Sequence, residues 1–101
     1  MARLMDDADL ARIVVEGFVE DIPRQIAALK GYLKAADVSG AERQAHTIKG
    51  ASANVGGDAL AAVAFKMEMA GKAGDLDAVK TSMAELEAQF GRLNQAITDD
   101  L

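Results

Sequence analysis

Residues 76–97 read LDAVKTSMAELEAQFGRLNQAI, and the spacing of their apolar side chains decides the fold class. These side chains recur in alternating steps of three and four over three heptads: Leu76, Val79, Met83, Leu86, Phe90, Leu93 and Ile97. Such a seam is typical of a helix that packs nearly parallel or antiparallel to its neighbours, at crossing angles of about 20°. The stretch therefore predicts one long helix of a helical bundle.

Four more helical stretches precede this one, separated by short breaks that contain glycine or aspartate. We expect helices over about 7–20, 22–36, 39–54 and 58–73. The first break, at Asp21-Ile22-Pro23, is a restart or a kink, because proline is tolerated in a first helical turn. Asp58 is the expected cap of the helix that follows it. Short connections favour antiparallel neighbours, so the prediction is an all-α fold, an antiparallel up-and-down four-helix bundle with an additional N-terminal helix.

Each of the four earlier stretches has an apolar stripe at helical spacing. The side chains expected to face the core are Leu10, Ile13, Val14, Gly17 and Phe18; Ile22, Ile26, Leu29 and Leu33; Ala41, Ala45, Ile48, Ser52 and Val55; and Leu60, Val63, Ala64, Met67, Ala70 and Gly71. These stripes provide one core for a chain of 101 residues, a length that fits one domain.

The composition excludes several classes of function. The formal net charge is −5, and this acidic balance argues against nucleic acid as a partner, which would require a basic face. The chain has no cysteine, so it has neither a disulfide framework nor a zinc–thiolate site. No apolar run approaches the roughly 18–20 residues of a transmembrane helix, and the N-terminus lacks the apolar core of a signal peptide. We therefore expect a cytoplasmic protein with no direct membrane insertion and no metal site.

The predicted helix over 39–54 carries the only histidine of the chain, His46. On a helical wheel of about 100° per residue, the apolar stripe centres between Ala45 and Ile48, and His46 falls about 140° away from it. The imidazole is therefore expected to face solvent. Its neighbours on that face are Glu42, Arg43, Lys49, Gly50 and, nearly in line with it seven residues on, Ala53.

The residues around His46 suit phosphoryl chemistry. A neutral imidazole is a nucleophile near pH 7. For phosphoryl transfer, the protein mainly has to position the reacting groups and to compensate the negative charge of the transferring oxygens. Lys49 and Arg43 supply positive charge beside the ring. Gly50 lies in mid-helix opposite the core, where glycine costs about 1 kcal/mol relative to alanine. With Ala53, it leaves room for the active site of a partner to approach.

Residues 46–56 read HTIKGASANVG and closely resemble the signature of histidine-containing phosphotransfer (HPt) domains. That signature has a histidine, an aliphatic residue at +2, Lys-Gly at +3 and +4, small residues next and a glycine at +10. Leu60 and Met67-Glu68 resemble residues of the family's next helix, and Gly74-Asp75-Leu76 resembles its turn into the last helix. The resemblance covers nearly the whole chain, although the first 35 residues match only in helical pattern.

The resemblance implies a single HPt-like domain over residues 1–101, in which His46 is the phosphorylation site. Its histidine would accept a phosphoryl group from a receiver-domain aspartate and donate it to another receiver in two-component signalling. Lys49 and Gly50 would be supporting residues, whereas Arg43 and Ala53 are candidates from the helical wheel alone. No cofactor is expected on this chain, because the Mg²⁺ belongs to the receiver.

The expected partners are response-regulator receiver domains and a hybrid sensor histidine kinase, of which the chain could itself be a part. The chain has no ATP-binding glycine motif and is too short for a kinase catalytic domain, so we expect a phosphoryl carrier and not an enzyme. We also expect a monomer. The seam over 76–97 could instead pair between two chains as a coiled coil, which would make a dimer.

Two other functions remain open at this point. A non-catalytic helical interaction module would leave His46 as an ordinary surface histidine. The phosphoacceptor domain of a chemotaxis-type histidine kinase would take its phosphate from a kinase domain instead of a receiver. Phe65 and Met69 lie four residues apart, away from the main stripe of their helix. They are expected either to pack against another edge of the bundle or to form an apolar docking patch beside His46.

Overall fold

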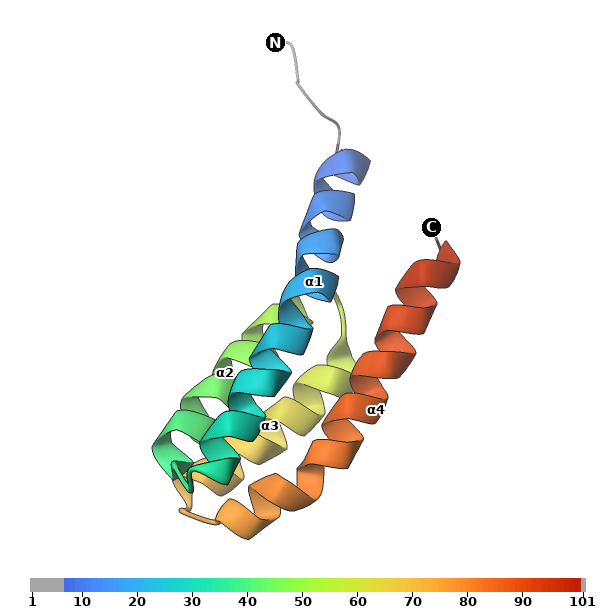
Figure 1. The fold of residues 1–101 in the computed structure, drawn as a ribbon. Helices are drawn as coiled ribbons and strands as arrows, with labels where there is room; N and C mark the ends of the chain where they lie inside the picture. Colours follow the sequence, from blue (N-terminus) through green and yellow to red (C-terminus); the bar gives the residue numbers. More distant parts are fainter. Residues whose placement is uncertain (1–6, 101) are drawn as a thin grey trace.

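The computed structural model describes residues 7–100, and these form four helices (Figure 1). The helices are α1 (Asp7–Lys34), α2 (Val38–Asn54), α3 (Asp58–Lys72) and α4 (Leu76–Asp100). Short connections reverse the chain direction at each step, consecutive helices pack together, and α1 also contacts α4. The predicted all-helical class is confirmed over the described residues. None of their helices is long and apolar enough to cross a membrane.

A single helix, α1, takes the place of the two helices predicted over 7–20 and 22–36, so the prediction of an additional N-terminal helix is wrong. Pro23 lies inside α1, where proline removes a hydrogen bond and costs about 3 kcal/mol. Burying one large apolar side chain contributes roughly 1.5–3 kcal/mol. The helix continues through Pro23 because one buried stripe runs along both sides of it: Phe18, Ile22, Ile26, Leu29 and Leu33.

The N-terminal half of α1 does not face the core as predicted. Leu10, Ile13 and Val14 are 52%, 52% and 47% exposed. This half of the helix extends beyond the end of α2 and α3, so fewer side chains are available to cover it (Figure 1). The apolar stripe of α1 is therefore buried only from Phe18 onward, where the ring lies 6.2 Å from that of Phe90 in α4.

The predicted inward faces of the other helices are confirmed in their main members. The buried side chains include Ala41, Ala45, Ile48 and Ser52 of α2, Leu60, Val63, Ala64 and Met67 of α3, and Val79 and Leu86 of α4. Ser52 is a polar member of this core, and its hydroxyl donates to the Ile48 carbonyl at 2.7 Å. It is therefore a small core residue whose polar group is satisfied within its own helix.

The helix α3 begins without the predicted side-chain cap. Its N-cap residue is Gly57, no side chain caps it, and Asp58 lies in its first turn instead. A Cβ on Gly57 would lie 2.6 Å from Leu93 Cδ2 and 3.3 Å from the Ser52 carbonyl oxygen, so any larger residue there would have to displace the Leu93 side chain of α4. By contrast, Asp37 does cap α2, because its carboxylate accepts from the Gly40 N–H at 2.9 Å.

The helices α2 and α3 approach each other closely at Gly71. A Cβ on this glycine would lie 2.8 Å from Glu42 Cβ and 3.1 Å from Glu42 Cα. Glycine thus lets the two backbones come together near the end of α3. This approach sets the exposed face of α2 beside the adjacent edge of α3, which is where the polar side chains of the candidate site meet.

Candidate functional site

The exposed face of α2 presents His46 to solvent, as the helical wheel predicts. The side chain of His46 is 65% exposed, whereas the neighbouring Ala45 and Ile48 are completely buried. The opposite face of α2 is therefore packed into the core, and this packing fixes the backbone position from which the imidazole extends. Because the ring itself is exposed, a large partner can reach it.

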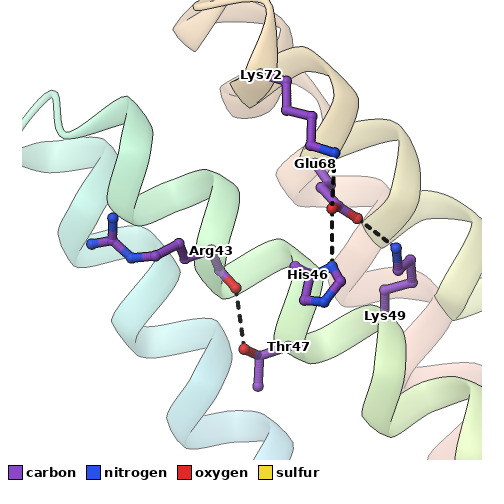
Figure 2. Close-up of polar contacts among 6 residues, drawn as sticks. All are labelled: Arg43, His46, Thr47, Lys49, Glu68 and Lys72. Atoms are coloured by element: carbon purple, nitrogen blue, oxygen red, sulfur yellow. Dashed lines mark hydrogen bonds and ion pairs between the residues drawn. The ribbon is translucent and has the colours of Figure 1, made fainter.

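A buried carboxylate from α3 orients the imidazole. Glu68 is only 6% exposed at its side chain, and its Oε2 lies 2.9 Å from His46 Nδ1 (Figure 2). An ionised carboxylate can only accept a hydrogen bond, so the shared proton is on Nδ1. In the neutral ring this leaves the lone pair on Nε2, the ring nitrogen that does not contact Glu68. The pair therefore fixes which nitrogen can act as a nucleophile.

Lys49 is a second partner of the carboxylate. Its ammonium donates to Glu68 Oε1 at 2.7 Å and lies 5.2 Å from the centre of the Phe65 ring. This hydrogen bond has the largest effect on the Glu68 carboxyl and lowers its pKa. Burial opposes the shift, and the hydrogen bond with His46 lowers the pKa further. Glu68 is thus ionised near neutral pH, which the orientation of His46 requires.

The register of α3 explains why a carboxylate is buried here. Glu68 follows the completely buried Met67 and lies one turn after the equally buried Ala64, so its stem belongs to the packed edge of the helix. A charge in such a place is tolerated only with partners. Both oxygens have them, and among the described residues no buried side-chain nitrogen or oxygen lacks a hydrogen bond.

The space beside His46 is open at Gly50. This glycine is exposed, and a Cβ built on it meets no atom within 4 Å. Packing within the described protein therefore gives no reason for glycine at this position. Ala53, the other small residue predicted to keep access open, is exposed on the same helix. That both serve the approach of a partner stays a prediction.

Arg43 is not brought to the imidazole. In Figure 2 its guanidinium points away from His46, and its backbone carbonyl accepts from Thr47 Oγ1 at 3.1 Å. Glu42, the other neighbour from the wheel, contacts the Gly71 position instead. Of the predicted charged residues, the structure therefore joins only Lys49 to His46, through Glu68. The supporting role of Arg43 stays a prediction.

The cluster at this site consists of His46, Lys49, Glu68 and Lys72. Glu68 and Lys72 were not among the predicted site residues. Lys72 Nζ lies 3.7 Å from Glu68 Oε2. Glu68 could have been found from the sequence, because an acidic residue on the edge of an apolar stripe needs a buried cationic or hydrogen-bonding partner. Lys72 carried no comparable signal, since a lysine in the last turn of a helix is common.

Phe65 and Met69 lie on the surface of α3. They are 48% and 39% exposed, so they do not pack into another edge of the described core. Phe65 is joined to the site through the Lys49 ammonium.

The described residues contain no group of three histidine, cysteine, aspartate or glutamate side chains placed to bind a metal ion.

The arrangement has one clear chemical capacity. A neutral, exposed imidazole with its Nδ1 proton held by a carboxylate can form a bond from Nε2 to an electrophile presented by another molecule.

The family model described as the Hpt domain matches residues 14–96, which include every member of this cluster. A search of the curated proteins found no match, and neither did a search of the solved structures.

Proposed function

The chain belongs to the Hpt-domain family, and on that premise we propose that His46 takes a phosphoryl group from the aspartate of one receiver domain and relays it to the aspartate of another. Histidine phosphotransfer in two-component signalling is what the family itself implies. One observation supports the assignment of His46 most strongly. Its imidazole is exposed while its Nδ1 is bonded to a buried carboxylate, which leaves Nε2 available to the partner.

The transfer step uses these positions directly. The Nε2 lone pair forms the N–P bond as the bond from phosphorus to the receiver aspartate oxygen breaks, and the aspartate leaves as a carboxylate. The ring retains its Nδ1 proton and becomes positively charged. Glu68 stabilises that charge through the 2.9 Å hydrogen bond. In the return step the N–P bond breaks and the same neutral tautomer is restored, so no proton has to leave the site.

The partner supplies what this chain lacks. We propose that the receiver contributes both the aspartate and the Mg²⁺ that compensates the charge of the transferring oxygens. The carrier contributes position and the positive charge of Lys49. An antiparallel four-helix bundle acting as a cytoplasmic monomer, free or as part of a hybrid sensor histidine kinase, fits this role. The acidic net charge makes nucleic acid an unsuitable partner.

The proposal is tested by following phosphate from a receiver to this protein. A purified receiver carrying labelled aspartyl phosphate is incubated with the protein, and the products are separated on a denaturing gel. We expect label on the protein that is lost in acid and retained in base, as a phosphoramidate bond requires. Absence of transfer from every receiver of the same cell would refute the relay function.

Gly50→Gln is expected to slow phosphoryl transfer by about tenfold or more, because a side chain there would misplace the approaching partner. The free protein should keep its fold and gain about 0.5–1 kcal/mol of stability, since glutamine favours a helix and no atom obstructs its Cβ. Single-turnover transfer rates and urea unfolding provide the two measurements.

The matched control for this variant is Gly91→Gln. Gly91 is also an exposed glycine within a helix, and a Cβ there also meets nothing within 4 Å. It should show the gain in stability without the loss of transfer. Equal transfer rates for Gly50→Gln and the wild type would contradict the access argument.

Phe65→Ala is expected to weaken receiver binding by about tenfold, because exposed aromatic side chains near the centre of an interface often contribute more than 1 kcal/mol. The fold should persist, since the ring is half exposed. Calorimetric titration with the receiver measures the affinity, and circular dichroism checks the helices. If the receiver binds both proteins equally, Phe65 is not a docking residue.

A further inference from the structure

Lys72, the last residue of α3, places a second ammonium group at the carboxylate that orients His46. Its Nζ lies 3.7 Å from Glu68 Oε2, the same oxygen that contacts His46 Nδ1 at 2.9 Å. Figure 2 shows Lys72 and Lys49 reaching Glu68 from different sides, with the imidazole on the third. The position of Lys72 is thus tied to the phosphorylation site and not to an unrelated surface ion pair.

The two lysines are held in different ways. Lys49 is 29% exposed, makes a 2.7 Å hydrogen bond to Oε1 and lies against the Phe65 ring. Lys72 is 53% exposed, and its 3.7 Å separation from Oε2 is longer than a hydrogen bond. An ion pair of this kind contributes little to stability. Lys72 is therefore the cation that can leave the carboxylate most easily.

The charge balance gives Lys72 a reason to move. With Glu68 ionised and the imidazole neutral, the two lysines leave one positive charge in excess at the site. A phosphoryl group on Nε2 would place about −1.5 to −2 charges beside the ring, and the single positive charge that the ring gains neutralises only part of them. If Lys72 leaves, Glu68 keeps a hydrogen bond on each oxygen, one from Lys49 and one from His46.

We propose that Lys72 binds the phosphoryl group of phosphorylated His46, an inference that rests on the proposed function of this site. The Lys72 ammonium leaves Glu68 Oε2 and pairs with the phosphoryl oxygens, while Lys49 stays on Glu68. No covalent bond changes in this step, because one ion pair replaces another. Lys72 thereby stabilises the phosphorylated carrier relative to the phosphorylated receiver and sets how the phosphate divides between them.

The test compares Lys72→Ala and Lys72→Arg with a matched control, Lys66→Ala. Lys66 is an exposed lysine of the same helix, but its ammonium pairs with Glu85 of α4 at 2.9 Å, away from Glu68. Each protein is phosphorylated in two ways, by a phosphorylated receiver and by the small-molecule donor phosphoramidate. The readouts are the equilibrium ratio of phosphorylated carrier to phosphorylated receiver and the phosphorus NMR titration of the attached group.

Lys72→Ala should shift the equilibrium toward the receiver by on the order of fivefold at low salt. The shift should shrink near 1 M salt, where charges are screened beyond about 3 Å. The midpoint of the phosphorus titration should move to higher pH, because a nearby ammonium favours the dianion. A purely structural role for Lys72 would not move this midpoint. Lys72→Arg should restore the wild-type values, and Lys66→Ala should not depart from them.

Two results would overturn the inference while leaving the proposed function intact: an unchanged ratio and midpoint in Lys72→Ala, or an equal change in Lys66→Ala. A wild-type protein that is labelled by phosphoramidate but by no receiver would refute the relay. The phosphorus titration would then still decide the role of Lys72. If His46 is labelled by neither donor, both the proposed function and this inference fall.

Discussion

His46→Gln should abolish phosphoryl labelling, because glutamine has no nucleophilic nitrogen to form the N–P bond. The loss should be complete, since His46 is the only histidine of the chain. The protein should nevertheless stay folded: the imidazole is 65% exposed, and the glutamine amide can donate to the same Glu68 oxygen. We expect the free energy of unfolding to change by about 1 kcal/mol or less.

The measurement pairs labelling by a phosphorylated receiver with urea unfolding of the same samples. The unfolding curve shows that lost label reflects lost chemistry and not a lost fold. Binding of the unphosphorylated receiver should also persist, because most of the interface is intact. Acid-labile label on the folded His46→Gln protein would mean that another residue accepts the phosphate, and the assignment of His46 would fail.

Glu68→Gln should slow phosphoryl transfer by about tenfold to a hundredfold. The amide keeps the shape of the side chain, but it has no negative charge to stabilise the ring as it becomes cationic. A hydrogen bond to a charged group is worth about 1.5–3 kcal/mol, and each 1.4 kcal/mol corresponds to about tenfold in rate. Rapid-quench kinetics with a phosphorylated receiver measures this effect.

The matched control for this variant is Glu85→Gln. Glu85 also pairs with a lysine across two helices, but it is 50% exposed and does not contact His46. Its substitution should leave the transfer rate within about twofold of the wild type, because exposed ion pairs contribute little. If the two variants transfer equally fast, Glu68 does not act through His46.

The stability of the wild type relative to Glu68→Gln should depend on pH. The hydrogen bond from Lys49, aided by that from His46, lowers the pKa of Glu68 in the folded protein. The contribution of ionised Glu68 to the free energy of unfolding is therefore fully present above the ordinary pKa of a glutamate. It is lost as the pH falls through the lowered pKa. Urea unfolding at pH 7 and at pH 3 should show a larger difference between the two proteins at pH 7.

The face of α2 was predictable because a helix of known register orients its own side chains. The spacing of Ala45, Ile48 and Ser52 placed His46 opposite the core, and the structure exposes it. Gly50 was predictable as a residue that the core does not require. The continuity of α1 through Pro23 was not predictable, because the local sequence shows a helix breaker but not the apolar stripe that is buried on both sides of it.

The sequence by itself determined the helical class, the inward faces of α2, α3 and α4, and the solvent-facing position of the only histidine, since these follow from periodicity and residue type within one helix. Only the tertiary structure decided the partners of His46. Glu68 is 22 positions away in the sequence and reaches the imidazole because α3 packs closely against α2 at Gly71. Packing between helices also decided that the stripe of α1 is buried only from Phe18 onward. His46 is thereby an oriented imidazole with one defined nucleophilic nitrogen.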